Sequence, residues 1–289
     1  MTDHAIVNGI MTPLSEARIS VLDLGFLRGL AVFETLRTYG GHPHALAEHH
    51  QRLAGGAAAM GFACPLDQAA LRRHIAAARA AASAQELRVN LVVTAGNQQD
   101  GLFDAGEPNW VIIARHLVPP PRRWYDDGCR AVTFCGARLH PEIKTTSYLS
   151  GRTGLAAAEA AGAIEALYVD EQGCITEGVT SNVMALRGST VFSPPQAALD
   201  GITRRHLAVL AAGIGLDWQR ADLRVEDLAD YDELWISSSV RELVPIIQVD
   251  DQVIGSGRPG PWAQRLGQLY HQTCLDEAQA DAAASKDAD

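Results

Sequence analysis

The stretch HPEIKTTSYLS, from His140 to Ser150, places a lysine between an isoleucine and a run of small hydroxyl residues. The chain has 24 lysines and arginines together, and most of them are arginines. A lysine shielded from water at such a position is either a poorly tolerated burial or a working amine, since an unpaired buried ammonium is costly. Which of the two applies to Lys144 depends on what the rest of the chain supplies.

Length and composition narrow the class of protein. A chain of 289 residues with 47% hydrophobic content has enough apolar surface for one large or two ordinary domains. The net charge of −10 disfavours nucleic acid as a partner, because phosphate binding needs a basic face. No apolar run reaches 18 residues, so no membrane span is expected, and the N-terminus lacks the pattern of a secretion signal. Five cysteines without a CxxC pair suit reduced thiols, so we expect a soluble, cytoplasmic protein.

The N-terminal region mixes strands and helices. VFETLRTYGGHPHAL predicts a hairpin that turns at Gly40-Gly41. The following segment has apolar residues at helical spacing up to Met60, and an alanine-rich helix begins near Asp67. Two strands, 87–96 and 109–118, are joined by a polar, glycine-containing loop. On the first of these strands, period two separates Leu87 and its apolar partners from a mixed face that carries Arg88.

A proline-rich segment indicates the domain boundary. Three consecutive prolines at 119–121 fit neither a helix nor a central strand. We therefore expect a small α+β N-terminal domain over 1–118, a linker over 119–123, a C-terminal cofactor-binding domain over 124–277 and a disordered tail over 278–289. Because strands and helices do not alternate strictly, the pattern predicts an α+β class rather than a Rossmann sheet.

Two conspicuous motifs have unremarkable explanations. GSGRPG at 255–260 matches G-x-G-x-x-G, but it contains a proline and no βαβ unit follows it, so it predicts a loop and not a dinucleotide site. The histidines at 42, 44, 49 and 50 do not match a zinc pattern, and adjacent helical residues point about 100° apart. We therefore expect no metal site.

Four features in chain order supply what a phosphorylated aldehyde cofactor needs. The amine of Lys144 could form an imine once its pKa is lowered from about 10.4. A carboxylate at Glu177 could keep a pyridine nitrogen protonated, and a protonated ring stabilises a substrate carbanion. LDGITRRH places free backbone N–H groups at a helix start, which favours a phosphate. The run Ser237–Ser239 adds hydroxyls that could complete the phosphate site.

Together these features resemble the class IV aminotransferases, the pyridoxal-phosphate enzymes of fold type IV. The resemblance runs from about Val21 to Gly260. It rests on the blocks GFLRGLAVFETLRTYGG, AEHHQRL, EIKTTSYLSG, EALYVDEQGCITEGVTSNV, LDGITRRHL, ISSSVRELVPI and IGSGRPGP. It implies two α/β domains with pyridoxal 5′-phosphate between them, and homodimers that share active sites.

The resemblance also implies roles for individual residues. Lys144 would form the Schiff base and move the proton at the substrate's α-carbon, and Glu177 would pair with the pyridine nitrogen. Arg52 would bind the phosphate and Tyr148 would lie beside the phenolic oxygen of the cofactor. Further cofactor contacts are expected from Asn182, Leu199, Ile202, Thr203, Ser238 and Ser239.

Substrate-binding residues depart from the family patterns. The block GFLRGLAVFE has Arg28 where many members have an aromatic residue. The loop NQQDGLFDAGE lacks the Arg and His with which D-amino acid members often bind the α-carboxylate. The Tyr-x-Arg of branched-chain members is reduced here to Glu86-Leu87-Arg88. Because a guanidinium can bind a carboxylate through two hydrogen bonds, Arg28 and Arg88 are the candidate substrate ligands, although either could be a surface ion pair.

The leading hypothesis is a transaminase that moves an amino group between an amino acid and a 2-oxo acid in two ping-pong half-reactions. D-amino acids are favoured as substrates, because neither signature of the branched-chain enzymes is complete. The alternatives are a branched-chain L-amino acid aminotransferase and a C–N lyase similar to aminodeoxychorismate lyase, which would need no acceptor 2-oxo acid. A descendant without catalytic activity is a further alternative, against which Lys144 and Glu177 argue.

Overall fold

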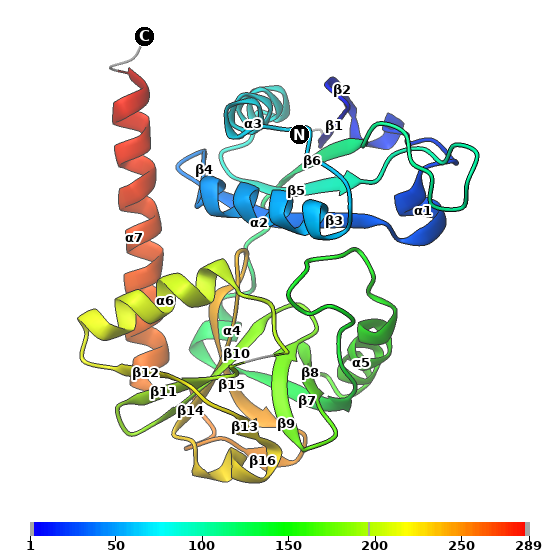
Figure 1. Ribbon diagram of the computed structural model, residues 1–289. Coiled ribbons are helices and arrows are strands. Elements are labelled where there is room, and N and C mark those ends of the chain that lie inside the picture. The colour runs from blue at the N-terminus through cyan, green and yellow to red at the C-terminus, as the bar shows by residue number, and fades with distance from the viewer. Residues whose placement is uncertain (1–2, 196, 287–289) are drawn as a thin grey trace. The chain divides into compact units, whose positions relative to one another are not determined.

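The computed structural model describes residues 3–195 and 197–286. Its residue contacts define two units, each with its own sheet (Figure 1). Unit 1 comprises residues 1–118, 143–147 and 273–289, and unit 2 comprises residues 119–142 and 148–272. The chain thus leaves unit 1 at the proline-rich segment and returns to it twice. No helix within the described ranges has the length and apolar character needed to cross a membrane.

Unit 1 is built on an antiparallel six-stranded sheet in the order β2-β1-β6-β5-β3-β4. Its strands are β1 (His4–Val7), β2 (Ile10–Pro13), β3 (Ala31–Tyr39), β4 (His42–Pro43), β5 (Leu87–Thr94) and β6 (Trp110–His116). Its helices are η1 (Leu14–Glu16), α1 (Leu24–Arg28), α2 (Leu46–Ala59) and α3 (Gln68–Ala82). The predicted hairpin is present, because Gly40 and Gly41 adopt φ of 55° and 84° between β3 and β4.

The core of unit 1 lies between one face of this sheet and helices α2 and α3. Leu53 on α2 and Ile75 on α3 belong to the same buried cluster as Leu36 on β3 and Leu91 on β5. The predicted alternation on β5 is confirmed, since its apolar face is buried and Arg88 is exposed on the other. Asp67 begins α3 by accepting a hydrogen bond from the backbone of the third residue that follows it.

Unit 2 contains a ten-stranded mixed sheet in the order β12-β11-β10-β14-β15-β7-β8-β9-β13, with β16 paired to β15. Its strands are β7 (Cys129–Cys135), β8 (Glu165–Val169), β9 (Cys174–Gly178), β10 (Asn182–Arg187), β11 (Thr190–Ser193), β12 (Asp217–Arg220), β13 (Leu223–Arg224), β14 (Glu233–Ser238), β15 (Glu242–Val249) and β16 (Gln252–Val253). Its helices are α4 (Arg123–Asp126), α5 (Leu149–Ala160), α6 (Ile202–Gly213), η2 (Val225–Asp230) and the first part of α7 (Pro261–Lys286). Two sheets with interspersed helices confirm the predicted α+β class.

The C-terminus differs from the sequence prediction. A disordered tail was expected from residue 278, but α7 continues to Lys286, and only 287–289 lie outside the described residues. The segment is rich in alanine, the best helix former. Ala278 is buried, and Asp281 pairs with Arg72 of α3, so tertiary contacts favour continuation of the helix. The GSGRPG segment forms the loop between β16 and α7.

Candidate active site

The backbone of Lys144 is fixed by strand-like pairing within unit 1. The N–H of Phe33 on β3 donates to the carbonyl of Lys144 at 2.9 Å, and the neighbouring residues Val32 and Thr145 form an isolated β-bridge. The Lys144 Nζ lies 4.6 Å from the centroid of the Phe33 ring, within the range of a cation–π contact. The half-buried amine is therefore presented over the β3 face opposite the apolar core.

Arg52 is held by a buried carboxylate on the neighbouring strand. Its Nε donates to Oε1 of Glu34 at 2.6 Å, and its Nη2 donates to Oε2 at 2.8 Å. The Nδ1 of His49, one turn earlier on α2, lies 2.8 Å from the same Oε2. Glu34 and His49 are fully buried, so the arginine is anchored to the interior of unit 1.

Charge within this cluster is set by burial and by the ion pair. Burial alone raises the pKa of Glu34, but the hydrogen bonds and charges of Arg52 and His49 outweigh it and lower that pKa to about 2. Burial lowers the pKa of His49 and outweighs the opposite pull of Glu34. At neutral pH the cluster therefore contains a carboxylate, a guanidinium and a neutral imidazole.

A second cluster surrounds Glu177 in unit 2. Its Oε2 accepts the backbone N–H of Leu199 at 2.9 Å, and its Oε1 lies 2.9 Å from Nε of Arg138 in an ion pair. Asn182 donates from Nδ2 to the backbone carbonyl of Leu199 at 2.8 Å. Both backbone polar groups of Leu199, its N–H and its carbonyl, are therefore hydrogen-bonded. The result is a buried carboxylate of fixed orientation, paired with a guanidinium, on strand β9.

Tyr148 joins the same cluster through Arg138. Burial raises the pKa of the Tyr148 hydroxyl, while the charge of Arg138 and its hydrogen bond to Tyr148 oppose that rise. Arg138 thus touches both Glu177 and Tyr148. Unit 2 brings together four of the residues implied by the resemblance: Tyr148, Glu177, Asn182 and Leu199.

The start of α6 has the features of an anion site. Gly201 occupies the N-cap, and no side chain in the described part of the chain caps this end of the helix. The first residues of the helix, Ile202 and Thr203, are buried, and their backbone N–H groups belong to the turn that has no intrahelical acceptors. Ser238 ends β14, and its Oγ accepts a hydrogen bond from Nε of Arg241 at 3.2 Å.

The candidate substrate ligands lie in unit 1, on exposed positions. Arg28 is the last residue of α1, and its Nη1 donates to the carbonyl of Leu27 at 2.9 Å. Arg88 lies on β5, directly opposite Arg37 of β3 and Arg115 of β6. The three arginines therefore share the sheet face that also carries Phe33. Like charges placed directly opposite each other on a sheet destabilise it.

Sequence reasoning missed Glu34 and Arg138. A signal for Glu34 was available, because the alternation of β3 places it on the same face as the buried Val32 and Leu36. A charged residue on an apolar face needs a partner. Arg138 had no such signal, since it lies in an irregular segment between β7 and α5.

Comparison with known proteins gives the family. Residues 31–249 match the model described as amino-transferase class IV, so the chain belongs to the class IV aminotransferases, which are pyridoxal-phosphate enzymes. The predicted family, enzyme class and cofactor are thereby confirmed. No group of three or more potential metal ligands is present among the described residues.

Individual relatives differ in activity. A putative branched-chain-amino-acid aminotransferase of Methanocaldococcus jannaschii is 30% identical over 91% of this chain and 94% of its own. The D-alanine aminotransferase of Bacillus licheniformis is 28% identical over 94% and 97%, and the aminodeoxychorismate lyase of Bacillus subtilis 27% over 91% and 92%.

A solved structure supports the fold. The branched-chain amino acid aminotransferase of Escherichia coli superposes with a TM-score of 0.86 at 25% identity, covering 93% of both chains. Fold type IV is therefore confirmed.

Proposed function

We propose that this enzyme transfers an amino group between an amino acid, with D-amino acids preferred, and a 2-oxo acid in two half-reactions. The proposal rests above all on the buried carboxylate of Glu177, held between Arg138 and the Leu199 N–H. When bound, pyridoxal phosphate supplies an electron-withdrawing ring and an aldehyde that carries the amino group.

The residues of the chain divide the remaining work. Lys144 would hold the aldehyde carbon of the cofactor through its Nζ and would move the proton at the substrate's α-carbon. Glu177 would accept a hydrogen bond from the protonated ring nitrogen, a role that suits a buried carboxylate of fixed orientation. Tyr148 would orient the phenolic oxygen, and Leu199 would pack on the ring with the support of Asn182.

The phosphate fits two groups of residues. Arg52 offers a guanidinium whose orientation is fixed by Glu34. A planar guanidinium group binds phosphate well, because it can donate two parallel hydrogen bonds. The uncapped start of α6 offers the N–H groups of Ile202 and Thr203, and Ser238 and Ser239 add hydroxyls near the end of β14. Both groups suit an anion, which supports their assignment to the cofactor.

The preference for D-amino acids is supported by the hydrogen bond that Glu86 makes within the sheet. Branched-chain members typically have Tyr at this position. Here the carboxylate of Glu86 accepts a hydrogen bond from the hydroxyl of Thr38, on the adjacent strand β3. Glu86 therefore serves the packing of the sheet and does not replace the tyrosine. The loop NQQDGLFDAGE also lacks the Arg and His with which D-amino acid members often bind the α-carboxylate. Arg28 is therefore the proposed ligand of the substrate carboxylate.

A branched-chain L-amino acid aminotransferase is the second candidate. It is favoured by the retained Arg88, whose neighbours Arg37 and Arg115 extend a basic row across the sheet, and by the 30% identity to the archaeal relative. A lyase is the third candidate, because it would use the same cofactor residues.

Half-reactions distinguish these candidates. Cofactor-loaded enzyme is mixed with single D- and L-amino acids (alanine, glutamate, leucine) without an acceptor, and loss of its visible absorption band is followed. Loss with D-alanine and D-glutamate alone is the expected result. Loss with L-leucine and L-glutamate would instead establish the branched-chain activity. An intact band with all of them would favour the lyase, which is then assayed by pyruvate release from aminodeoxychorismate.

We further propose that the enzyme is a homodimer. Five large apolar side chains in unit 1 are between 54% and 73% exposed: Val21, Leu22, Phe26, Leu102 and Phe103. They belong to the segment around α1 and to the loop 97–107, which an isolated β-bridge joins. Exposed apolar patches of this kind mark association surfaces.

A further inference from the structure

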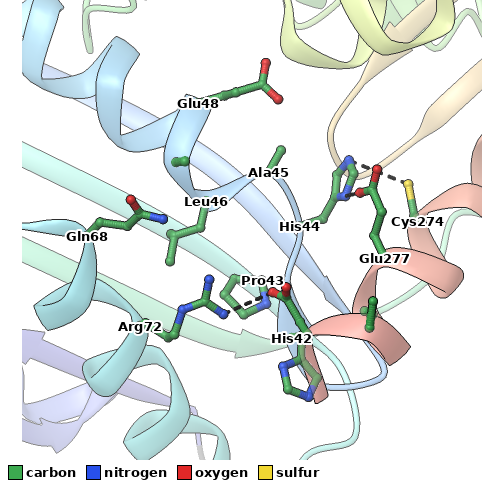
Figure 2. Close-up of a pocket in the computed structure, with 14 residues that line it drawn as sticks. His42, Pro43, His44, Ala45, Leu46, Glu48, Gln68, Arg72, Cys274 and Glu277 are labelled. Carbon is green, nitrogen blue, oxygen red and sulfur yellow. Dashed lines mark hydrogen bonds and ion pairs between the residues drawn. The ribbon is translucent and has the colours of Figure 1, made fainter. Parts of the chain in front are cut away.

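Unit 1 contains a cavity of about 330 Å³ whose residues have no part in the proposed reaction (Figure 2). Its walls come from β4 and the first turn of α2, from the start of α3 and from residues 274–281 of α7. Its polar lining includes His44, Glu48, Arg72, Cys274, Glu277 and Asp281.

Three of these side chains form a chain of polar contacts. The Sγ of Cys274 lies 3.6 Å from Nε2 of His44, and Nδ1 of His44 lies 3.2 Å from Oε2 of Glu277 (Figure 2). An ionised carboxylate can only accept a hydrogen bond, so Nδ1 carries the imidazole proton. Nε2 is then the acceptor for the thiol proton. The nucleophile Cys274 thus contacts the base His44, which in turn contacts Glu277, the group that orients it.

Local structure places these residues. Cys274, Glu277 and Asp281 are separated by three and four positions on α7, so they share one face of the helix. His44 precedes Ala45, whose φ of 51° lies in the left-handed region and turns the chain into α2. The ring of Tyr39 meets the His44 ring edge-on, with centroids 5.6 Å apart. The imidazole is therefore held from three sides.

The thiols of Cys64, which is half-buried, and of the buried Cys129 and Cys174 have a different environment. Burial raises the pKa of Cys64 and of Cys174, and it raises the pKa of Cys129 to about 12. Among the described cysteines, only Cys274 has an imidazole as a hydrogen-bonding partner. Cys135 is exposed and provides an internal reference for an ordinary thiol.

We propose that Cys274 is an activated thiol and that small uncharged electrophiles entering this cavity modify it covalently. With an alkyl halide, the Sγ–carbon bond forms as the carbon–halogen bond breaks. The halide leaves with the bonding electrons, and the thiol proton passes to Nε2 of His44. Neither sulfur nor cofactor changes oxidation state, so no further reactant is needed.

The charge of the cavity determines which electrophiles are admitted. Glu48, Glu277 and Asp281 contribute three carboxylates to its lining. The one arginine, Arg72, is paired through Nη1 with Asp281 at 3.1 Å. Anionic reagents are therefore disfavoured relative to neutral ones. Cys274 itself is only 1% exposed, so alkylation by a reagent of the size of iodoacetamide requires local opening of the cavity lining.

The test is a time course of alkylation of the holoenzyme at pH 7 with iodoacetamide, resolved by peptide mass spectrometry. Cys274 is expected to react faster than Cys64, Cys129 and Cys174. The ratio of the iodoacetamide rate to the iodoacetate rate is expected to be larger at Cys274 than at Cys135. Equal rates at Cys274 and at these three thiols would overturn the proposal.

Two variants test the role of the imidazole. His44→Gln is expected to slow alkylation of Cys274 by about a hundredfold or more, the lower end of general-base assistance, and to leave Cys135 unchanged. Glu277 is 55% exposed, so Glu277→Gln should fold normally and slow the reaction by a smaller factor. An unchanged rate at Cys274 in both variants would show that its reactivity is independent of His44.

Discussion

Glu34 on strand β3 and Arg52 on helix α2 form a bidentate ion pair. The Nε of Arg52 lies 2.6 Å from Oε1 of Glu34, and its Nη2 lies 2.8 Å from Oε2. The carboxylate faces the core, where a lone charge would be strongly disfavoured. His49 completes its coordination from the same helix. The arginine fork is therefore oriented by the fold itself.

Replacing Glu34 with glutamine should weaken cofactor binding. The variant places an amide N–H₂ against the guanidinium and removes the charge that orients it. We expect a loss of about 3 kcal/mol in unfolding free energy, typical of a broken buried pair, and about tenfold weaker binding of pyridoxal phosphate. Fluorescence titration of the apoenzyme measures the affinity. Glu86→Gln is the matched control, because it changes a carboxylate of the same unit that accepts a hydrogen bond from Thr38. Wild-type affinity in Glu34→Gln would contradict the assignment of Arg52 to the phosphate.

Acid should destabilise unit 1 in two stages. The folded pKa of His49 lies below its ordinary 6.5, so the unfolded state binds its proton first and stability falls as pH drops below about 6.5. Glu34 has a folded pKa of about 2 against an ordinary 4.5, so its contribution of about 3 kcal/mol is complete above 4.5 and is lost towards pH 2. Urea unfolding of the apoenzyme at several pH values measures both stages. Glu34→Gln should lack the lower stage, and an identical slope in both proteins below pH 4.5 would refute this account.

Local patterns predicted the elements better than the contacts between them. The alternation on β5 and the paired glycines after β3 depend on neighbours in sequence, and both were predicted. The Glu34–Arg52 pair required knowing that α2 packs on β3. The contact between His44 and Cys274 joins residues 230 positions apart, which no local pattern encodes. The small and charged residues after 277 are typical of disorder, whereas α7 continues there because Ala278 is buried by tertiary contacts that the local sequence does not encode.

Glu177→Gln should reduce turnover sharply and leave the cofactor bound. A glutamine side chain can still accept the Leu199 N–H, so local structure is preserved. It is a poorer partner for a protonated ring nitrogen and loses the ion pair with Arg138. We expect kcat to fall by about a hundredfold or more, in the range of lost electrostatic stabilisation. Steady-state kinetics and the cofactor absorbance of the purified variant measure the two effects. Full activity would remove Glu177 from the mechanism.

Arg28 and Arg88 give a direct test of the substrate assignment. If Arg28 binds the carboxylate of a D-amino acid, Arg28→Ala should raise KM for D-alanine by about tenfold and have little effect on a simple primary amine. Arg115→Ala, on the same sheet face as Arg88, controls for the loss of a surface charge. A larger effect of Arg88→Ala, seen with L-leucine, would favour the branched-chain candidate. Equal losses with amine and amino acid would make Arg28 structural.

The exposed patch around α1 should control association. Phe26 is 70% exposed, and an aspartate there would place a charge within an apolar interface, where it would be unpaired and desolvated. Phe26→Asp is therefore expected to shift the protein from dimer to monomer in light-scattering measurements at micromolar concentration. Val209→Asp is the matched control, because Val209 is 74% exposed but lies on α6, outside the patch. A monomeric wild type would disprove the dimer, and a dimeric Phe26→Asp variant would place its interface elsewhere.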